Sequence, residues 1–411
     1  MDAIRICCAG LDVHQESITA CILNSPLDRK PKPLIKSFGT TTRELLQLQD
    51  WLAEHKCTEV AMESTGVYWK SVWNILESSC KLTLANPAHI KNMPGRKTDV
   101  KDAQWITQLH RCGLVQASMV PTQAIRDLRD RTRYRQKIVH MITSEKNRIH
   151  KLLQDANIKL TTFVSDLFGV SGRALLEKLM DGEVLDEEQV RGLVKTKLKK
   201  KVPQLVDALN GKVRLHHREM IRMHMDTIKH LEKQMEQLVQ SIQELLKPYQ
   251  KEVELLDTIP GINNDAAASI IAEIGINMDL FQTEAHLASW AGICPGNNES
   301  AGVKKKSKSR KGNKHLKAML CQAVWAINAK KDCRITSFFH RVKRRQGDKK
   351  AVMATAHLYL RIIYNILSNK VEYSELGTHY LPDKKARTLD QLKKQIEKMG
   401  YAIQLEHIQA S

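Results

Sequence analysis

Short apolar runs alternating with polar turns occupy the first part of the chain. Two runs within residues 3–23, separated by the polar turn HQE, predict two strands, and LIKSFGT is a candidate third strand. TTRELLQLQDWLAEH has helical periodicity, EVAMEST has the pattern of a buried strand, VYWKSVWNILESS that of a helix, and KLTLANP that of a strand stopped by Pro87. Strands in a leading run, followed by strand–helix alternation, predict an α/β domain with a mixed sheet.

Helical spacing dominates the rest of the chain. TDVKDAQWITQLHRCG predicts a helix that Thr98 is placed to cap, and helical regions follow at roughly 122–160 and 170–205. Residues 217–247 then carry a heptad seam, with apolar positions at alternating spacings of four and three. Such a seam must be covered, either by another helix of a bundle or by a second protomer. The seam positions are Ile221, His224, Ile228, Leu231, Met235, Leu238, Ile242 and Leu245.

These patterns divide the chain into four predicted parts. An α/β domain occupies residues 1–160, a helical and coiled-coil region 161–250, a mostly helical C-terminal domain 251–375, and a polar tail 376–411. The order of strand-rich and helix-rich parts predicts at least two separate cores.

The C-terminal part contains a segment, TIPGINNDAAASIIAEIG, that resembles a helix-hairpin-helix. This module binds phosphate through backbone N–H groups at a helix N-terminus. Asn263 and Asn264 follow the turn where a second glycine is common. A purely structural hairpin is therefore an equal alternative to phosphate binding.

Charge narrows the class of partner. The chain has 65 Lys and Arg against 45 Asp and Glu, a net charge of +20, which predicts a polyanionic partner such as nucleic acid or an anionic membrane. No apolar run approaches the roughly 20 residues that span a membrane, and MDAIRICCAGLDVHQ lacks the features of a signal peptide. Nine cysteines without a C-x-x-C pair indicate reduced thiols rather than disulfides or zinc. We therefore expect a nucleic-acid-binding protein of the cytoplasm.

Two basic segments are candidates for contacting phosphates. Residues 303–317 contain eight Lys or Arg and no acid, which predicts salt-dependent and largely sequence-blind affinity. Arg126, Arg129 and Arg133 recur at helical spacing and could form a second stripe, although nearby aspartates could instead pair with them. Aromatic residues are only 5% of the chain, so base stacking is not the expected main binding mode. The candidates in the first segment are Lys304, Lys305, Lys306, Lys308, Arg310, Lys311 and Lys314.

Four acidic residues have positions typical of a metal site. Asp12 and Glu63 each fall at the end of a predicted strand, and Asp99 and Asp102 lie three residues apart on one helix face. Strand ends and a helix N-terminus can converge at one sheet edge, where four carboxylates would repel unless hard cations such as Mg²⁺ bound them. Two such ions could activate one oxygen and stabilise another in phosphodiester displacement. Taken singly, such residues are more often turn, capping or solvated carboxylates, and only their joint arrangement in a basic chain makes a metal site an equal alternative.

The blocks GLDVHQ, AMESTGVYW and KTDVKDAQ, in this order, resemble the DEDD transposases of the insertion-sequence-110 type, the bridge-RNA-guided recombinases. The resemblance runs across residues 6–155 and resumes at about 252–330. It implies an RNase H-like (RuvC-like) fold for the N-terminal domain. It also places Asp12, Glu63, Asp99 and Asp102 on the family's catalytic, Mg²⁺-binding positions.

A second block, WAGICPGNNESAGVKKKSKSRKGNKHLK, resembles the transposase domain of the same family. The resemblance places Ser300 on the serine that attacks the DNA backbone and holds a covalent phosphoserine link. Serine is a weak nucleophile that needs a base or a metal, and no base is evident near Ser300. The metal site would have to supply activation, which requires the two domains to meet, in the family between protomers.

The resemblance also implies partners. Target sequence would be read by pairing with a noncoding bridge RNA, while the protein recognises shape and backbone. A composite site needs at least a dimer, and we expect the heptad helix, 217–247, to pair protomers into a dimer or tetramer. The expected location is the bacterial cytoplasm, at the nucleoid.

The sequence therefore predicts a DNA transposase that cuts and rejoins DNA during excision and insertion of a mobile element. One alternative is a RuvC-like metal-dependent nuclease or junction resolvase that uses water as nucleophile. A second is a non-enzymatic nucleic-acid-binding scaffold, which leaves the ordered acidic blocks without a role. Replacing Ser300 separates the first two, because a nuclease would still cut DNA.

Overall fold

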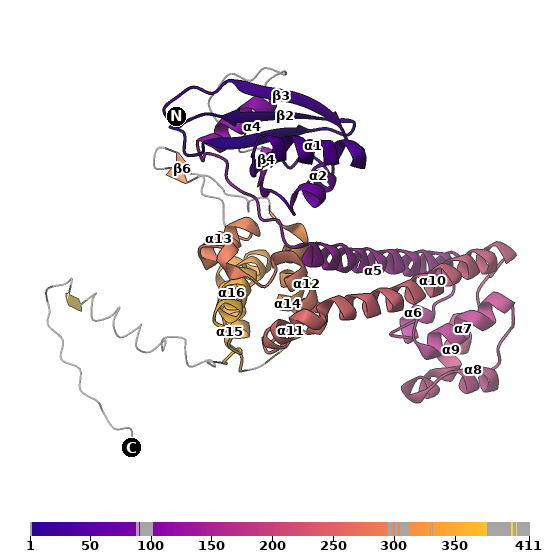
Figure 1. Cartoon of the computed structure of the whole chain (residues 1–411). Helices are drawn as coiled ribbons and strands as arrows, with labels where there is room; N and C mark the ends of the chain where they lie inside the picture. Colours follow the sequence, from indigo (N-terminus) through magenta and orange to yellow (C-terminus); the bar gives the residue numbers. More distant parts are fainter. Residues whose placement is uncertain are drawn as a thin grey trace. The chain divides into compact units, whose positions relative to one another are not determined.

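The protein is described by a computed structural model that forms two compact units, Met1–Val120 and Pro121–Ser411 (Figure 1). The structure describes all residues except 1, 88–89, 91–101, 295–298, 301–302, 305–311, 329, 331, 376–395, 398–399 and 401–411.

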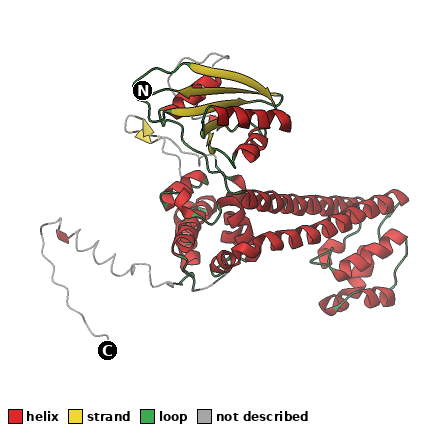
Figure 2. Cartoon of the chain, in the orientation of Figure 1, coloured by secondary structure: helices red, strands yellow, loops and turns green. Residues whose placement is uncertain are grey.

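The first unit is built on a five-stranded mixed sheet with strand order β3-β2-β1-β4-β5 (Figure 2). Strands β1, β2 and β3 are antiparallel neighbours, whereas β4 and β5 run parallel to β1. The mixed sheet predicted from the sequence is thus present, and it is consistent with an RNase H-like fold. The strands are β1 (Cys7–Val13), β2 (Ser17–Asn24), β3 (Pro33–Gly39), β4 (Glu59–Glu63) and β5 (Lys81–Ala85).

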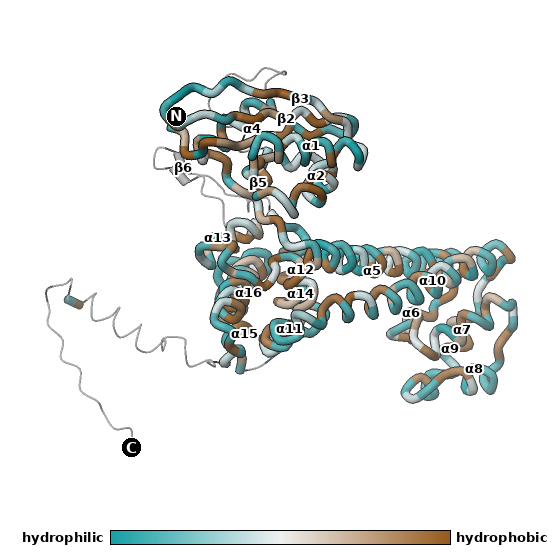
Figure 3. The backbone as a smooth tube through the Cα atoms, in the orientation of Figure 1, coloured by the Kyte–Doolittle hydropathy of each residue, from teal (hydrophilic) through white to brown (hydrophobic). Residues whose placement is uncertain are grey.

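Helices cover both faces of this sheet. Helices α1 (Thr42–Glu54) and α2 (Trp69–Leu76) pack with Leu11 and Met62 in the core of one face. Helix α4 (Asp102–Arg111) packs on the other face, where its Ile106 and Leu109 contact small residues of β4 and β5. Strands β1, β2 and β4 are accordingly apolar along most of their length (Figure 3), because residues on both faces are buried. The edge strand β3 is largely exposed.

The second unit contains a long helical hairpin of α5 (Gln123–Asp155) and α10 (Leu215–Leu246) (Figure 1). The two helices are antiparallel, since Arg131 bonds Ser241 at one end and Asp155 pairs with His217 at the other. A small helical core packs against the end of the hairpin where Asp155 and His217 lie. Its elements are α6 (Leu160–Phe163), α7 (Val170–Asp181), α8 (Glu187–Leu193), η2 (Thr196–Lys201) and α9 (Val202–Leu209).

The heptad seam of α10 is covered within the chain. Seam residues Ile221, Ile228 and Ile242 are buried, and α5 is the main neighbour of α10. His224, also a seam position, lies against Glu145 of α5, with 2.6 Å between Nδ1 and Oε2. Of the two alternatives that the pattern left open, the structure shows the helical bundle. The buried positions of the seam therefore pack within the chain, whereas we expected them to pair protomers; Met235, Leu238 and Leu245 are only partly buried.

A second helical bundle follows α10. The bundle is held by contacts of α16 with α13, α14 and α15, and of α12 with α5, α11 and α14. Among the described helices, none combines the length and the hydrophobicity of a membrane-spanning segment. The elements are η3 (Lys247–Tyr249), α11 (Gln250–Asp257), α12 (Asn264–Ile274), η4 (Met278–Leu280), α13 (Glu284–Trp290), β6 (Glu299–Ser300), β7 (Val303–Lys304), α14 (Lys314–Ala326), α15 (Arg334–Gln346) and α16 (Asp348–Asn369).

The hairpin between α11 and α12 has its turn packed against the bundle. Gly261 has φ +85°, and a Cβ there would lie 2.3 Å from Ile327 Cγ2 and 2.8 Å from the Ala323 carbonyl oxygen. The Tyr359 hydroxyl donates to the Pro260 carbonyl at 2.6 Å. This packing favours the structural interpretation of the hairpin over phosphate binding by its turn.

The boundary between the two units differs from the expected one at residue 160. Helix α5 belongs to the second unit, because it packs along α10 and against α12. Sequence periodicity could not place it, since the partners of α5 lie about 100 residues further along the chain.

Candidate active site

Asp12 and Glu63 lie side by side at the ends of adjacent strands. Strands β1 and β4 are parallel, and Leu11 is paired with Met62, so the next residue of each strand is one of the two acids. Residues in register on neighbouring parallel strands point to the same face. That face is the one covered by α4, because Gly10 and Ala61, two residues before each acid, both face α4.

Helix α4 brings Asp102 to the same edge. The helix runs antiparallel to β1: Arg111 at its C-terminus bonds the Arg5 carbonyl at 3.1 Å, and Ala103 near its N-terminus lies over Gly10. A Cβ on Gly10 would lie 2.5 Å from the Thr107 backbone nitrogen and 2.7 Å from the Ala103 carbonyl oxygen. Only glycine permits this close approach. Asp102, the first residue of α4, is thus at the end of β1 where Asp12 lies.

Polar side chains that the sequence did not single out surround this edge. His14 Nε2 lies 3.2 Å from Asp12 Oδ2, and the Thr65 hydroxyl donates to Glu63 Oε1 at 3.2 Å. The Tyr68 hydroxyl donates to Gln15 Oε1 at 3.1 Å, which joins the loops that follow β1 and β4. The signal for these residues was present, since all lie inside the blocks that carry the acids.

The donor set fits a hard divalent cation in kind. Asp12 and Glu63 are partly exposed, and no described lysine or arginine forms an ion pair with either of them. Carboxylate oxygens from two strand ends and a helix start are the ligands that Mg²⁺ prefers. The described residues do not by themselves form a group of three His, Cys, Asp or Glu at metal-binding distance. The fourth predicted ligand, Asp99, lies outside them.

The serine segment belongs to the second unit. Ser300 is in the two-residue strand β6, paired with Val303 of β7. Of the predicted phosphate contacts in this segment, Lys314 starts α14 and is exposed. The side chain of Lys304 is not described, and Lys305, Lys306, Lys308, Arg310 and Lys311 lie outside the described residues.

The predicted arginine stripe of α5 has a different role in the structure. Arg133 makes a two-pronged bond with Glu273 of α12, at 2.7 Å from Nε to Oε1 and 2.8 Å from Nη2 to Oε2. Arg129 donates to the carbonyls of Ala272 and Glu273. Arg126 bonds the Pro121 carbonyl at the start of its own helix. These guanidiniums bond protein acceptors, and neither of the two expectations from the sequence, phosphates or nearby aspartates, describes these bonds.

Glu273 was missed because its partners are 140 residues away in sequence. It is 3% exposed. Burial alone would raise the pKa of its carboxyl, but the bonds from Arg133 and Asn313 outweigh burial and leave that pKa below its usual value. The carboxylate is therefore held ionised inside the bundle.

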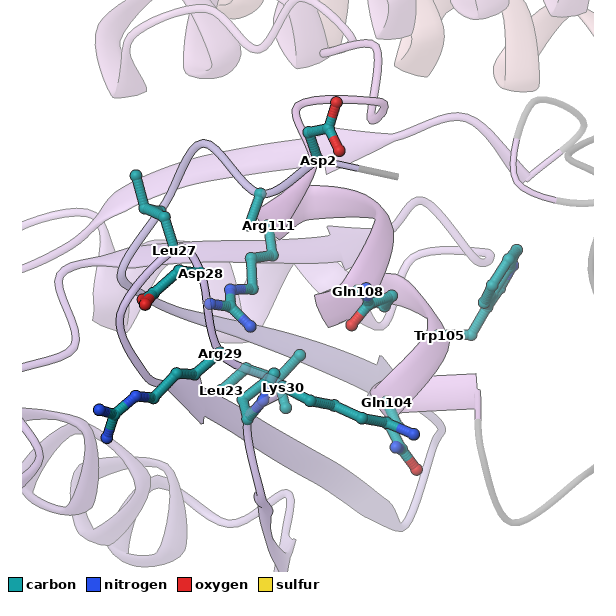
Figure 4. A pocket seen from close by; sticks show the side chains of 12 residues that line it. Asp2, Leu23, Leu27, Asp28, Arg29, Lys30, Gln104, Trp105, Gln108 and Arg111 are labelled. Carbon is teal, nitrogen blue, oxygen red and sulfur yellow. The ribbon is translucent and has the colours of Figure 1, made fainter.

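A cavity of about 610 Å³ lies beside α4 in the first unit (Figure 4). Gln104, Gln108 and Arg111 line it from α4, and Arg29 and Lys30 line it from the loop after β2. Two aspartates, Asp2 and Asp28, also line it, so the three cationic side chains are largely offset. Arg111 is 2% exposed and donates to the carbonyls of Arg5, Ser25 and Pro26, which ties the chain start to α4.

Comparison with known proteins agrees with these two regions. A family model described as a transposase, of the DEDD insertion-sequence-110 type, matches residues 9–158. A model described as the transposase IS116/IS110/IS902 family matches residues 253–340. Proteins named pilin gene-inverting protein, from Moraxella lacunata and Moraxella bovis, are each 24% identical over 373 residues, covering 87% of this chain and 94% of theirs.

The two family models together cover more than half of the chain, in the order in which the motifs occur. One contains the acidic edge and the other contains the serine segment. The chain therefore belongs to the DEDD transposases of the insertion-sequence-110 type, metal-dependent enzymes that bind DNA and cut and rejoin it when a mobile element moves.

Proposed function

We propose that this transposase binds Mg²⁺ through Asp12, Glu63, Asp99 and Asp102 and attacks DNA with Ser300. The observation that supports the proposal most directly is the placement of Asp12, Glu63 and Asp102 at one end of β1 and on one face of the sheet. Divalent cations bound there would polarise the phosphodiester and lower the pKa of a coordinated oxygen.

In the proposed reaction each step forms one phosphorus–oxygen bond and breaks another, so the energy of the phosphodiester is conserved. Ser300 Oγ gives up its proton and attacks phosphorus, the bond from phosphorus to one deoxyribose oxygen breaks, and that oxygen leaves as a hydroxyl after taking up a proton. Attack of a second DNA hydroxyl on the phosphoserine reverses these changes and joins a new strand, so ATP is not needed. The likeness to proteins named for inverting a gene supports cutting with rejoining over simple hydrolysis.

We propose that the basic segment, 303–317, contacts DNA phosphates, and that a noncoding bridge RNA supplies sequence recognition. Because the acids and Ser300 lie in separate units, a homo-oligomer with a composite site is part of the same proposal. Pairing would use outer faces of the α5–α10 hairpin, where Tyr134, Val139 and Met141 are exposed, since the inward seam is covered.

A covalent-trapping assay tests the proposal. Protein, candidate RNA and Mg²⁺ are incubated with labelled element-end DNA, then denatured and separated on a gel. We expect a labelled protein band that is lost in Ser300→Ala and without Mg²⁺. The matched control is Ser309→Ala, because Ser309 lies in the same segment outside the family motif. Cut DNA without attached protein would instead establish the nuclease that uses water.

A further inference from the structure

The loop that carries Ser300 leaves and re-enters the bundle at one point, the loop neck, formed by Ala291, Gly292 and Gly312. A Cβ on Gly312 would lie 2.4 Å from the Gly292 backbone nitrogen and 2.6 Å from the Ala291 carbonyl oxygen. Gly292 has φ +70°, a conformation that favours glycine. The backbone before and after the loop is therefore in direct contact, and movement of one side must move the other.

Asn313, the residue after the neck, is fixed at both ends of its amide. Its Oδ1 caps α14 by accepting from the backbone nitrogens of His315 and Leu316, each at 3.1 Å. Its Nδ2 donates to Glu273 Oε2 at 2.5 Å. Rotation of the amide would break both sets of bonds at once, because the donor would then face backbone N–H groups.

Glu273 connects the neck to α5. Its carboxylate accepts three bonds, two from Arg133 and one from Asn313. The network extends to His315, whose Nδ1 lies 3.2 Å from Gln136 Oε1 on the next turn of α5. The line from Arg133 through Glu273 to Asn313, the Glu273 relay, thus joins the α5–α10 hairpin to the base of the serine loop.

Stability alone does not call for such a relay. A buried ion pair often contributes little net stability compared with apolar residues of similar volume, and in some proteins it serves to fix geometry. The geometry fixed here is that of Asn313, one residue from the neck. Orientation of a reacting group is what such a constraint supplies to a reaction.

We propose that Glu273 is a positioning residue for strand transfer: the Glu273 relay orients the loop neck and thereby sets the approach of Ser300 to DNA. The proposal rests on the proposed function of Ser300. Neither Glu273 nor Arg133 touches DNA in this mechanism, and DNA affinity does not depend on them. Loss of the relay lowers the rate of covalent attack and leaves DNA binding intact.

The test compares two asparagine-to-aspartate changes in the full-length protein. Asn313→Asp keeps the helix cap but replaces the amide donor with a carboxylate facing Glu273. Asn277→Asp is the matched control, since Asn277 also caps a helical turn, accepting from the Asp279 nitrogen at 2.9 Å. For each variant, the single-turnover rate of covalent adduct formation, DNA affinity and the thermal unfolding midpoint are measured.

We expect Asn313→Asp to lower the adduct rate by about 10- to 100-fold with DNA affinity within about twofold of wild type, and Asn277→Asp to match wild type. Lowering the pH should raise the ratio of variant to wild-type rate, because a proton shared by the introduced carboxyl and Glu273 restores a donor. The double change Glu273→Gln with Asn313→Asp restores the bond between these two side chains with donor and acceptor exchanged and keeps the net charge. It loses the second Arg133 bond, which also uses Oε2, but keeps the bond from Arg133 Nε to Oε1. It should recover part of the rate lost in Asn313→Asp.

Other outcomes overturn the proposal. A wild-type rate in Asn313→Asp, or a loss that only follows the fraction of unfolded protein and is not recovered in the double variant, assigns the relay to folding alone. A loss of DNA affinity equal to the loss of rate assigns it to binding. If wild-type protein forms no adduct while cutting DNA, the proposed function of Ser300 fails, and that result is distinct from failure of the relay.

Discussion

The acidic edge and the serine segment are positioned in opposite ways. Asp12 and Glu63 are held by strand register, and Asp102 by a helix whose backbone touches Gly10. Ser300 instead lies between two points of a loop whose described anchors are a glycine contact and a polar network. The first arrangement fixes several ligands at once, as a metal site requires. The second arrangement holds a single group only through the residues at the base of its loop.

This comparison predicts that replacing one of the acidic residues lowers the rate of DNA cleavage without unfolding the protein. Asp12→Asn keeps the shape of the side chain but removes a charge that the metal needs. We expect the rate of DNA cleavage to fall by more than about 100-fold, because replacing even a residue that only holds a metal ligand in place costs up to about 100-fold. The measurement is the initial rate of strand cleavage together with the unfolding midpoint. Asp28→Asn, an exposed aspartate of the same unit, should keep full activity; equal losses in both would refute the assignment.

Acid should weaken the first unit through His110. Burial, followed by the nearby charge of Arg5, lowers the pKa of His110 to about 4. The unfolded chain binds a proton near pH 6.5 while the folded chain does not, so the free energy of unfolding falls as the pH drops from about 6.5 to about 4. The expected loss is on the order of 3 kcal/mol. Urea unfolding at several pH values measures it, and His110→Phe should flatten this part of the profile.

Gly10→Ala tests how the acidic edge is built. The added methyl would meet backbone atoms of α4, so the helix must shift, and we expect a loss of roughly 1–3 kcal/mol in the free energy of unfolding together with weaker metal binding. Gly192→Ala is the matched control. Gly192 lies in α8, and a Cβ added there would have nothing within 4 Å, so alanine should stabilise slightly. Calorimetry with and without Mg²⁺ separates the two effects.

The smallest expected effect is on the salt dependence of DNA affinity. It distinguishes cationic side chains that contact phosphates from those that bond within the protein. Lys314→Ala should reduce the slope of log affinity against log salt by about 0.9, the value for one lost phosphate contact. Arg133→Ala should leave that slope unchanged, because its guanidinium bonds Glu273. Titrations of labelled DNA at several salt concentrations provide the slopes. A reduced slope in Arg133→Ala would return this residue to the phosphate-binding stripe.

Local pattern was sufficient for most of the first unit. Alternation and turn residues predicted the strands, and the position of Asp12 and Glu63 at strand ends followed from those strands. The close contact at Gly10 could not be predicted, since it depends on a helix that begins 92 residues later. The proximity of His14 and Thr65 to the acids could have been predicted, because each is two residues from its partner.

Sequence spacing was a poorer guide to the second unit. The heptad pattern on α10 was correct in position, but periodicity reports only that an apolar face is covered and not which helix covers it. Likewise, Arg129 and Arg133 share a helix face with potential aspartate partners, yet the structure pairs them with Glu273 of α12. A buried carboxylate that draws cations inward has no local signature in the sequence.

The long separation between Arg133 and Glu273 has a consequence for synthesis of the chain. At ordinary translation rates of about 5–20 residues per second, the 140 residues between them require roughly 7 to 28 seconds. During this interval α5 can close its hairpin with α10 on the ribosome, while Arg133 remains hydrated. Only the arrival of α12 and Asn313 completes the network. A chain truncated before that point would leave these guanidiniums without their buried acceptor. The serine-bearing bundle is therefore the last part of the nascent chain to form.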